Sequence, residues 1–222
     1  MLPGRRVSCR SADTGYMADR KHGEPAPETT STIRDEDWDG RDLDGERFER
    51  VAFIDVDMIE LQNKGAVFTE CSFRGVRLNA STHSAAAFIN CTFTRCAFFD
   101  ATFTGCKMTG SMFDGCTLDL LKVAGGDWSF VGLPGAKLDS ATITDVRMRE
   151  ADLTGARCAG ATLRRVDLSG AWLHRADLSR ADLRGSDLTG LDPLTVELKG
   201  AIIDPYQSVI IAMALGLEVR DT

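Results

Sequence analysis

Large apolar side chains recur at every fifth position from Trp38 to Ile203, without one insertion. Only Asn63, His83 and Pro193 interrupt this series of central positions, if cysteine is counted as apolar. Two residues before each central position stands a smaller, mostly apolar residue, and the other three are mostly polar residues or glycine. An internal period of this length and regularity determines the fold.

A period of five fits neither regular secondary structure by itself. Five residues advance a side chain by roughly 140° around an α-helix, and they reverse its face on a β-strand. A spacing of two within each five, however, places both apolar residues on one side of a short extended segment. The remaining residues suit a turn. Each five therefore predicts one side and one corner of a coil whose apolar residues point inward.

Unusual residues indicate how many sides the coil has. Pairs of them recur at a spacing of twenty: Asn63 with His83, Cys71 with Cys91, and Cys96 with Cys116. Residues stacked in successive coils share an environment, so unusual residues tend to align. Cys91 and Cys106, fifteen apart, do not follow this spacing. We interpret the coil as a square of twenty residues.

The repeated unit has the form small residue, Asp or Asn, Leu or Phe, polar residue, Gly. It is clearest as Ala-Asp-Leu-Thr-Gly at 151–155 and as Ala-Asp-Leu-Arg-Gly at 181–185. On these residues the chain resembles the pentapeptide-repeat family. The resemblance implies an all-β solenoid, a right-handed quadrilateral β-helix of about eight coils, over residues 36–203. Coils about 4.8 Å apart would make a rod of roughly 40 Å.

Both ends of the chain lack the five-residue period. Residues 1–35 contain prolines, glycine and a polar run, which predict a flexible tail; alternatively, the part around Ile33 folds over the first coil. At the other end Asp204-Pro205 predicts the start of a helix and Gly216 its end, so that residues 204–222 would cap the solenoid.

The C-terminal helix has more apolar surface than the last coil can cover. One part of this surface suits the coil, and the surplus predicts a two-fold dimer through this end of the rod. The residues expected at the dimer interface are Tyr206, Val209, Ile210, Met213, Leu215 and Leu217.

Acidic residues are concentrated at the start of the solenoid. Between residues 36 and 60, ten acidic residues and three arginines give a local net charge of −7, which equals that of the whole chain. This end is either a solvated surface that resists aggregation or an anionic surface that competes with nucleic acid for a basic groove. The residues expected to bind a partner are Asp37, Asp39, Asp42, Asp44, Asp57, Asp167, Asp177, Asp187 and Trp172.

Alternatives remain for the later members of that set. Asp167 and Asp187 are expected one above the other, but an aspartate at this place in the repeat can also bond the backbone of its own turn. Trp172 is expected to point outward, where an indole often anchors an interface. It could equally lie flat on a neighbouring side chain.

Enzymatic chemistry has no support in the sequence. No nucleophile motif, zinc-site spacing or phosphate loop occurs, and His83 falls at an interior position that suits a packed, hydrogen-bonded residue. Five of the seven cysteines stand at the small interior position, where a free cysteine acts as a small buried hydrophobic residue. A reducing compartment would keep these thiols from forming disulfides. No apolar run is long enough for a membrane span. We therefore expect a cytoplasmic, non-enzymatic protein without a cofactor or metal.

Within the family, the order of features is similar to that of the MfpA group of fluoroquinolone-resistance proteins; the Qnr group shares the fold. The residues that carry this similarity include Phe-Ile-Asn-Cys-Thr-Phe at 88–93 and the terminal helix. The resemblance implies a C-terminally joined dimer that imitates duplex DNA, binds DNA gyrase and protects it from fluoroquinolones or another gyrase poison, without binding nucleic acid itself. The chain departs from the Qnr group because it has no projecting loops, and from the MfpA group in its longer tail.

The net charge of the expected dimer is much smaller than that of duplex DNA of the same length. A dimer carries −14, twice the −7 of one chain, whereas roughly 80 Å of duplex carries about 47 charges. Imitation would therefore depend on where the charges lie. The alternative function is a scaffold of the same fold that binds a different protein and has no topoisomerase role.

Overall fold

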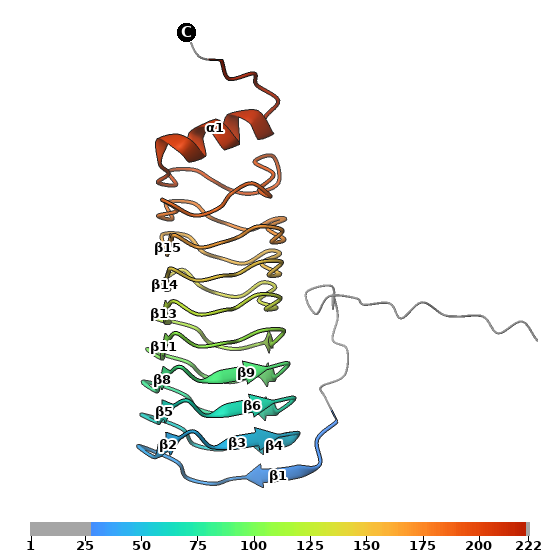
Figure 1. The fold of residues 1–222 in the computed structure, drawn as a ribbon, viewed down its shortest axis with the longest axis vertical. Helices are drawn as coiled ribbons and strands as arrows, with labels where there is room; N and C mark the ends of the chain where they lie inside the picture. Colours follow the sequence, from blue (N-terminus) through green and yellow to red (C-terminus); the bar gives the residue numbers. More distant parts are fainter. Residues whose placement is uncertain (1–27, 221–222) are drawn as a thin grey trace, which may run out of the picture.

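The computed structural model describes residues 28–220, in which the chain winds coil upon coil into a rod that ends in one helix (Figure 1). The elements are β1 (Ser31–Arg34), β2 (Asp42–Asp44), β3 (Arg47–Glu49), β4 (Val51–Ile54), β5 (Gln62–Lys64), β6 (Val67–Thr69), β7 (Ser72–Arg74), β8 (Thr82–Ser84), β9 (Ala87–Ile89), β10 (Thr92–Thr94), β11 (Thr102–Thr104), β12 (Met112–Asp114), β13 (Lys122–Ala124), β14 (Thr142–Thr144), β15 (Thr162–Arg164) and α1 (Pro205–Ala214).

Parallel pairing between residues twenty apart gives the rod four faces, which we number in chain order. Face 1 holds β1, β4, β7, β10 and β12; face 3 holds β2, β5, β8, β11, β13, β14 and β15; face 4 holds β3, β6 and β9. Face 2 is built from single bridges such as that between Ala97 and Thr117. On face 3, pairing from Asp42 to Ile202 makes eight consecutive steps of twenty residues. The square coil and the number of coils are thus confirmed.

The central side chains fill the rod, and those from Phe53 to Leu188 are all buried. Phenylalanines of successive coils stack face to face, with ring centroids 4.7 Å apart for Phe68 and Phe88 and 4.8 Å apart for Phe53 and Phe73. The ring spacing matches the sheet spacing of about 4.8 Å, so one backbone step brings each ring onto the next. Burial stabilises the fold by roughly 1.5–3 kcal/mol for each such side chain.

The corners need a left-handed backbone rather than glycine itself. The φ angle is positive at every fifth residue from Asp35 to Gly200, except at 140, 190 and 195. At seventeen of these corners the residue is not glycine, as at Asn90 and Leu120. A left-handed residue other than glycine costs about 1–2 kcal/mol. Its backbone N–H is nevertheless paired with the next coil, as in Asn90 N to Thr109 O at 3.0 Å.

The small interior cysteines are free thiols with a hydrogen-bonding role. Sγ of Cys71 donates to the carbonyl of Phe48 at 3.4 Å, and Sγ of Cys91 donates to that of Phe68 at 3.4 Å. The hydroxyl of Ser111 donates in the same way to the carbonyl of Phe88 at 3.0 Å. These positions therefore favour a residue that is small and that also carries a hydrogen-bond donor, such as a thiol or a hydroxyl.

The solenoid begins earlier than residue 36. Strand β1 pairs with β4, and Ile33 packs against the core. Ile33 stands five residues before Trp38, so the five-residue register extends one unit further than expected. The assignment of residues 31–35 to a tail is therefore wrong. The alternative, that the part around Ile33 folds over the first coil, is closer, because this part forms an additional side of the solenoid in register with β4. Residues 1–27 lie outside the described part, where a tail stays a prediction.

Helix α1 starts and ends as the sequence indicates. Asp204 and Gln207 form a capping box: Oδ1 of Asp204 accepts from the backbone N–H of Gln207 at 3.0 Å, and Oε1 of Gln207 accepts from that of Asp204 at 2.9 Å. The backbone N–H groups of Gln207 and Gly185 lower the pKa of Asp204. The buried Gln207 also donates to the carbonyls of Leu183 and Ser186, at 2.6 and 2.7 Å. A polar side chain thus fixes the helix to the last coil, which apolar periodicity did not predict.

Candidate protein-interaction surfaces

Four carboxylates of the first coil form what we call the first-coil acidic surface: Asp37, Asp39, Asp42 and Asp44. The first two lie on face 2 and the other two on face 3, on either side of the corner at Gly40. All four are exposed, and none takes part in an ion pair among residues 28–220. This surface is the part of the expected acidic set that the fold brings together.

The same carboxylates lie beside an open sheet edge. Within the described residues β2 has one neighbour, β5, and β3 has one neighbour, β6. Charged residues at such an edge discourage pairing with another chain. The first-coil acidic surface can therefore protect the end of the solenoid, whatever else it does.

Asp57 differs from the four residues below it. It lies directly above Asp37 on face 2, but its carboxylate forms an ion pair with Arg77, which lies one coil further up. Its other oxygen accepts from the backbone N–H of Ile59 at 3.2 Å. The charge of Asp57 is thus largely compensated within the chain.

The later aspartates lie on other parts of the rod. Asp167 and Asp187 stack on face 4, as expected, whereas Asp177 lies on face 2 across the rod from them. Asp177 accepts from the backbone N–H of Ser179 at 2.9 Å, and the hydroxyl and N–H of Ser179 lower the pKa of Asp177. Asp187 makes the equivalent bonds to Thr189, at 2.9 and 2.7 Å. The alternative, that these aspartates bond their own turns, is confirmed.

Trp172 lies on face 1, paired in the ladder with Asp152. Trp172 is half-buried, and its ladder neighbour Asp152 is buried. The expected partner-binding residues are therefore distributed over all four faces, and they do not form one continuous surface.

Ion pairs between coils compensate many charges beyond the first coils. Examples are Lys122–Asp100 at 2.6 Å, Arg147–Asp127 at 3.1 Å, Arg149–Asp167 at 2.6 Å, Arg157–Asp139 at 3.4 Å and Arg165–Asp145 at 2.6 Å. Exposed pairs of this kind contribute at most about 1 kcal/mol each to stability. Their larger effect is on the field of the rod, whose uncompensated negative charge lies at its N-terminal end.

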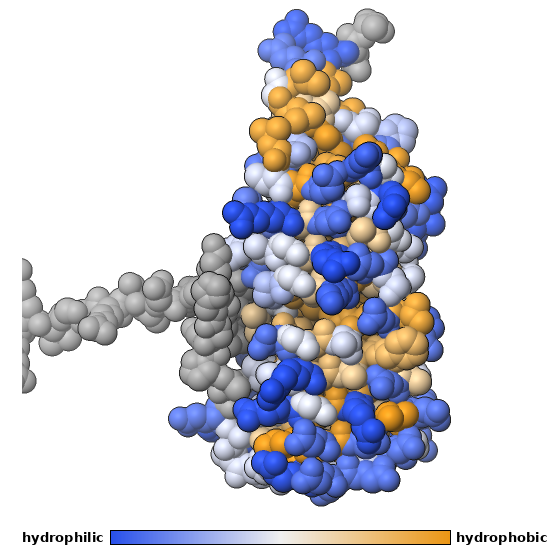
Figure 2. Space-filling view, turned by 180° about the vertical axis from the view of Figure 1, so that it is seen from behind, coloured by the Kyte–Doolittle hydropathy of each residue, from blue (hydrophilic) through white to orange (hydrophobic). Residues whose placement is uncertain are grey.

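Apolar residues, orange in Figure 2, gather near the C-terminal end of the rod, just below the hydrophilic tip at the top of the view. Gln207 and Ile211 occupy the side of α1 that contacts the solenoid. Of the expected dimer residues, Tyr206, Met213 and Leu217 have exposed fractions of 74%, 62% and 61%, and Leu215 is also exposed. Val209 and Ile210 are half-buried. We call the exposed set, Tyr206, Met213, Leu215 and Leu217, the C-terminal apolar surface.

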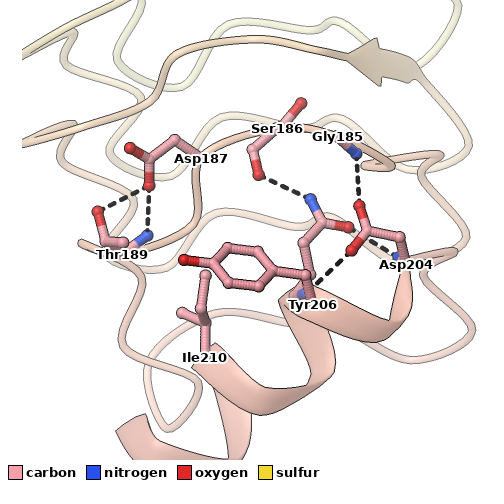
Figure 3. Close-up of a pocket in the computed structure, with 8 residues that line it drawn as sticks. Gly185, Ser186, Asp187, Thr189, Asp204, Tyr206 and Ile210 are labelled. Carbon is pink, nitrogen blue, oxygen red and sulfur yellow. Dashed lines mark hydrogen bonds between the residues drawn. The ribbon is translucent and has the colours of Figure 1, made fainter.

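A cleft of about 270 Å³ lies between α1 and the last coil (Figure 3). Tyr206 and Ile210 lie along the helix side of this cleft, and Asp187 and Thr189 lie on the coil side. Both carboxylate oxygens of Asp204 are bonded, one of them to the backbone N–H of Gly185 at 2.9 Å. The cleft is continuous with the C-terminal apolar surface, because Tyr206 belongs to both.

His83 is fully buried, and burial lowers its pKa to about 3. No three His, Cys, Asp or Glu side chains within residues 28–220 are placed to hold a metal ion. Within the same residues no helix has the length and apolar character that crossing a membrane requires.

Comparison with known proteins places the repeats in a family. A model described as pentapeptide repeats matches eight copies, in residues 84–119, 133–170 and 151–190. The pentapeptide repeat protein MfpA of Mycolicibacterium smegmatis is 43% identical over 61 residues, which are 28% of this chain and 27% of that protein. MfpA of Mycobacterium tuberculosis is 49% identical over 43 residues, 19% of this chain and 24% of that one. The matches thus span about a quarter of these relatives.

Two solved structures are similar to the chain at low sequence identity. One is trypsin-treated QnrB1, a plasmid-mediated fluoroquinolone resistance protein, at 21% identity and a TM-score of 0.36, covering 87% of this chain and 99% of that one. Another is HetL from Nostoc, a pentapeptide repeat protein involved in heterocyst differentiation regulation, at 20% identity and a TM-score of 0.37, covering 79% and 87%. The matched residues, 84–119 and 133–190, are thus pentapeptide repeats, and the same five-residue register and twenty-residue coil continue on either side of them.

Proposed function

We propose that this protein binds DNA gyrase and protects it from fluoroquinolones or another gyrase poison, by occupying as a dimer the surface that duplex DNA would take. The observation that supports this proposal is the first-coil acidic surface, whose four carboxylates are exposed on adjoining faces and form no ion pair with any other residue of 28–220. The resemblance of the chain to the MfpA group supplies the partner.

The geometry of the rod determines where such a dimer carries its charge. Eight steps of about 4.8 Å give each rod a length of roughly 38 Å. Joining two rods through their C-terminal apolar surfaces places the two first-coil acidic surfaces at the far tips. The dimer as a whole carries far less charge than DNA of equal length, so a basic groove would recognise the tips.

A supercoiling assay with purified gyrase tests the proposal. The full chain is added with and without a fluoroquinolone, and we expect it to restore supercoiling in the poisoned reaction. Asp37→Lys with Asp39→Lys should weaken this protection at least tenfold, because it reverses half of the first-coil acidic surface. Asp114→Lys with Asp119→Lys is the matched control, since it makes the same change in net charge at exposed residues further along the rod.

A scaffold that binds another protein is the second candidate. The position of the acidic residues beside the open edges of β2 and β3 is compatible with it, because edge protection accounts for these residues without a basic groove on gyrase. If the chain changes neither arm of the supercoiling assay, the scaffold is favoured. If it protects gyrase but the Asp37/Asp39 variant protects equally well, gyrase binding stands and the first-coil acidic surface is not the contact.

A further inference from the structure

Two cysteines of face 2 stand directly above one another. The backbone N–H of Thr117 donates to the carbonyl of Cys96 at 3.0 Å, and Ala97 and Thr117 are paired, so Cys116 lies one coil above Cys96 in register. Registered coils are about 4.8 Å apart. A disulfide spans a Cα separation of roughly 4.4–6.8 Å, so the backbone already has the spacing that this bond requires.

The two side chains also point the same way. Sγ of Cys96 donates to the carbonyl of Phe73 at 3.4 Å, and Sγ of Cys116 donates to that of Phe93 at 3.4 Å. These acceptors are themselves stacked residues of face 1, paired through β7 and β10. Each sulfur therefore occupies the same position relative to its own coil, and the two sulfurs lie in one column.

Accessibility distinguishes the two thiols. Cys96 is 1% exposed, whereas Cys116 is only partly buried. The next residue up the column is Ala136, also partly buried, which carries only a methyl group over Cys116. The thiol of Cys96 lowers the pKa of Cys116, and the same contact with burial raises the pKa of Cys96. The more accessible sulfur is thus the better nucleophile, because the thiolate is the reactive form.

We propose that Cys96 and Cys116 are an oxidisable dithiol, which a low-molecular-weight disulfide converts into a covalent link between two successive coils. The Cys116 thiolate attacks one sulfur of the reagent, forms a mixed disulfide and releases one reagent thiolate. The Cys96 thiol then loses its proton and attacks Sγ of Cys116, which releases the second reagent thiolate. Two protein thiols are oxidised, one reagent disulfide is reduced to two thiols, and the bond formed joins residues twenty apart.

A second stacked pair provides an internal comparison. Cys71 and Cys91 lie in register on face 1, since the backbone N–H of Thr92 donates to the carbonyl of Cys71 at 3.0 Å. Both of these cysteines are fully buried. A thiol that the reagent cannot reach does not start the exchange, so this pair should stay reduced in the folded protein while Cys96 and Cys116 react.

The test uses the full chain with Cys9→Ser, which removes a cysteine that lies outside the described residues. The reduced protein is incubated with glutathione disulfide under native conditions, free thiols are alkylated, and intact mass and peptide mapping follow. We expect two fewer alkylated thiols than in the untreated protein, and a linked peptide pair that contains Cys96 and Cys116. Cys71→Ser should give the same link.

Two variants distinguish the steps. Cys116→Ser should keep every remaining thiol, and Cys96→Ser should accumulate a glutathione adduct on Cys116 without a link. Serine is tolerated at such positions, because Ser111 occupies one and makes the equivalent hydrogen bond; circular dichroism confirms folding. An adduct on Cys116 that persists in the parent chain, oxidation of Cys71 and Cys91 first, or no loss of thiols would each overturn the proposal.

Discussion

The side-chain nitrogen of Asn63 lies 3.1 Å from Nδ1 of His83, one coil above it, inside the solenoid. The hydroxyl of Ser81 donates to the carbonyl of Leu78 at 2.7 Å, so at 3.0 Å it accepts from Nε2 of His83. These directions assign a neutral His83 that carries its proton on Nε2 and accepts from Asn63. Oδ1 of Asn63 accepts from the backbone N–H of Ala66 at 3.1 Å. The two polar central residues thus satisfy one another.

Because Asn63 and His83 are hydrogen-bond partners, replacing one of them should affect the stability of the fold differently from replacing both. Asn63→Leu leaves Nδ1 of His83 without its donor, and His83→Phe leaves the Asn63 amide without its acceptor. We expect each single variant to lose about 1–3 kcal/mol of the free energy of unfolding. The double variant should lose less than either, because Phe at 83 would stack on Phe103, whose ring lies 4.5 Å from that of His83. Urea unfolding of the parent chain, the two single variants and the double variant measures these losses. If the loss in the double variant equals the sum of the two single losses, Asn63 and His83 are not coupled.

The depressed pKa of His83 predicts how stability depends on pH. In the unfolded chain a histidine titrates near 6.5, whereas burial lowers the pKa of His83 to about 3. Between these values the unfolded state binds one proton more, so this residue makes the free energy of unfolding fall by about 1.4 kcal/mol for each pH unit below 6.5. The double variant Asn63→Leu/His83→Phe lacks this contribution. Equal pH slopes for it and the parent chain between pH 6 and 5 would contradict the assignment.

Gly126 is the glycine whose replacement should be most damaging. It stands at a small interior position with φ of +99°, and a Cβ there would collide with the backbone carbonyl and N–H of Cys106. The left-handed conformation costs an alanine about 1–2 kcal/mol, and overpacking adds about 1–3 kcal/mol. Gly126→Ala should therefore lower the free energy of unfolding by roughly 3 kcal/mol or more.

Gly135→Ala is the control for this substitution. Gly135 has a φ of +66°, and no atom lies within 4 Å of the position of its Cβ. Only the conformational cost of about 1–2 kcal/mol applies. Thermal unfolding of both variants would separate the two terms, and equal losses would show that the collision at Cys106 relaxes away.

The fold was predictable because one strong period encodes it. Apolar residues such as Phe68 and Phe88 occupy equivalent places, and their spacing alone implies stacked coils. The helix was predictable from Asp204-Pro205 and Gly216, which have direct backbone roles. Register also predicted that Asp167 would lie beneath Asp187. All of these follow from positions along the chain, which a sequence displays.

The interaction surfaces were predictable only in part, because exposure and pairing depend on side chains from neighbouring coils. Asp57 and Asp37 look alike in the sequence, yet Arg77 compensates one and not the other. The role of Gln207 depends on the carbonyls of Leu183 and Ser186 that the last coil presents, which no local pattern reveals. A comparison of the charges of residues twenty apart in the sequence would have predicted the ion pair between Asp57 and Arg77.

The C-terminal apolar surface gives the prediction that bears most directly on assembly. Met213→Asp with Leu217→Asp places two charges on a surface that is exposed in the single chain, so the fold should persist. In a dimer through this end the same charges would be buried, at a cost of several kcal/mol each. We therefore expect the parent chain to be dimeric and this variant to be monomeric by light scattering. Phe99→Asp with Leu120→Asp supplies the control, because it adds the same two charges at apolar residues of the middle coils that are 51% and 43% exposed, and it should leave the dimer intact. A parent chain that is monomeric at micromolar concentration, or a Met213/Leu217 variant that stays dimeric, would show that this apolar surface serves a different contact.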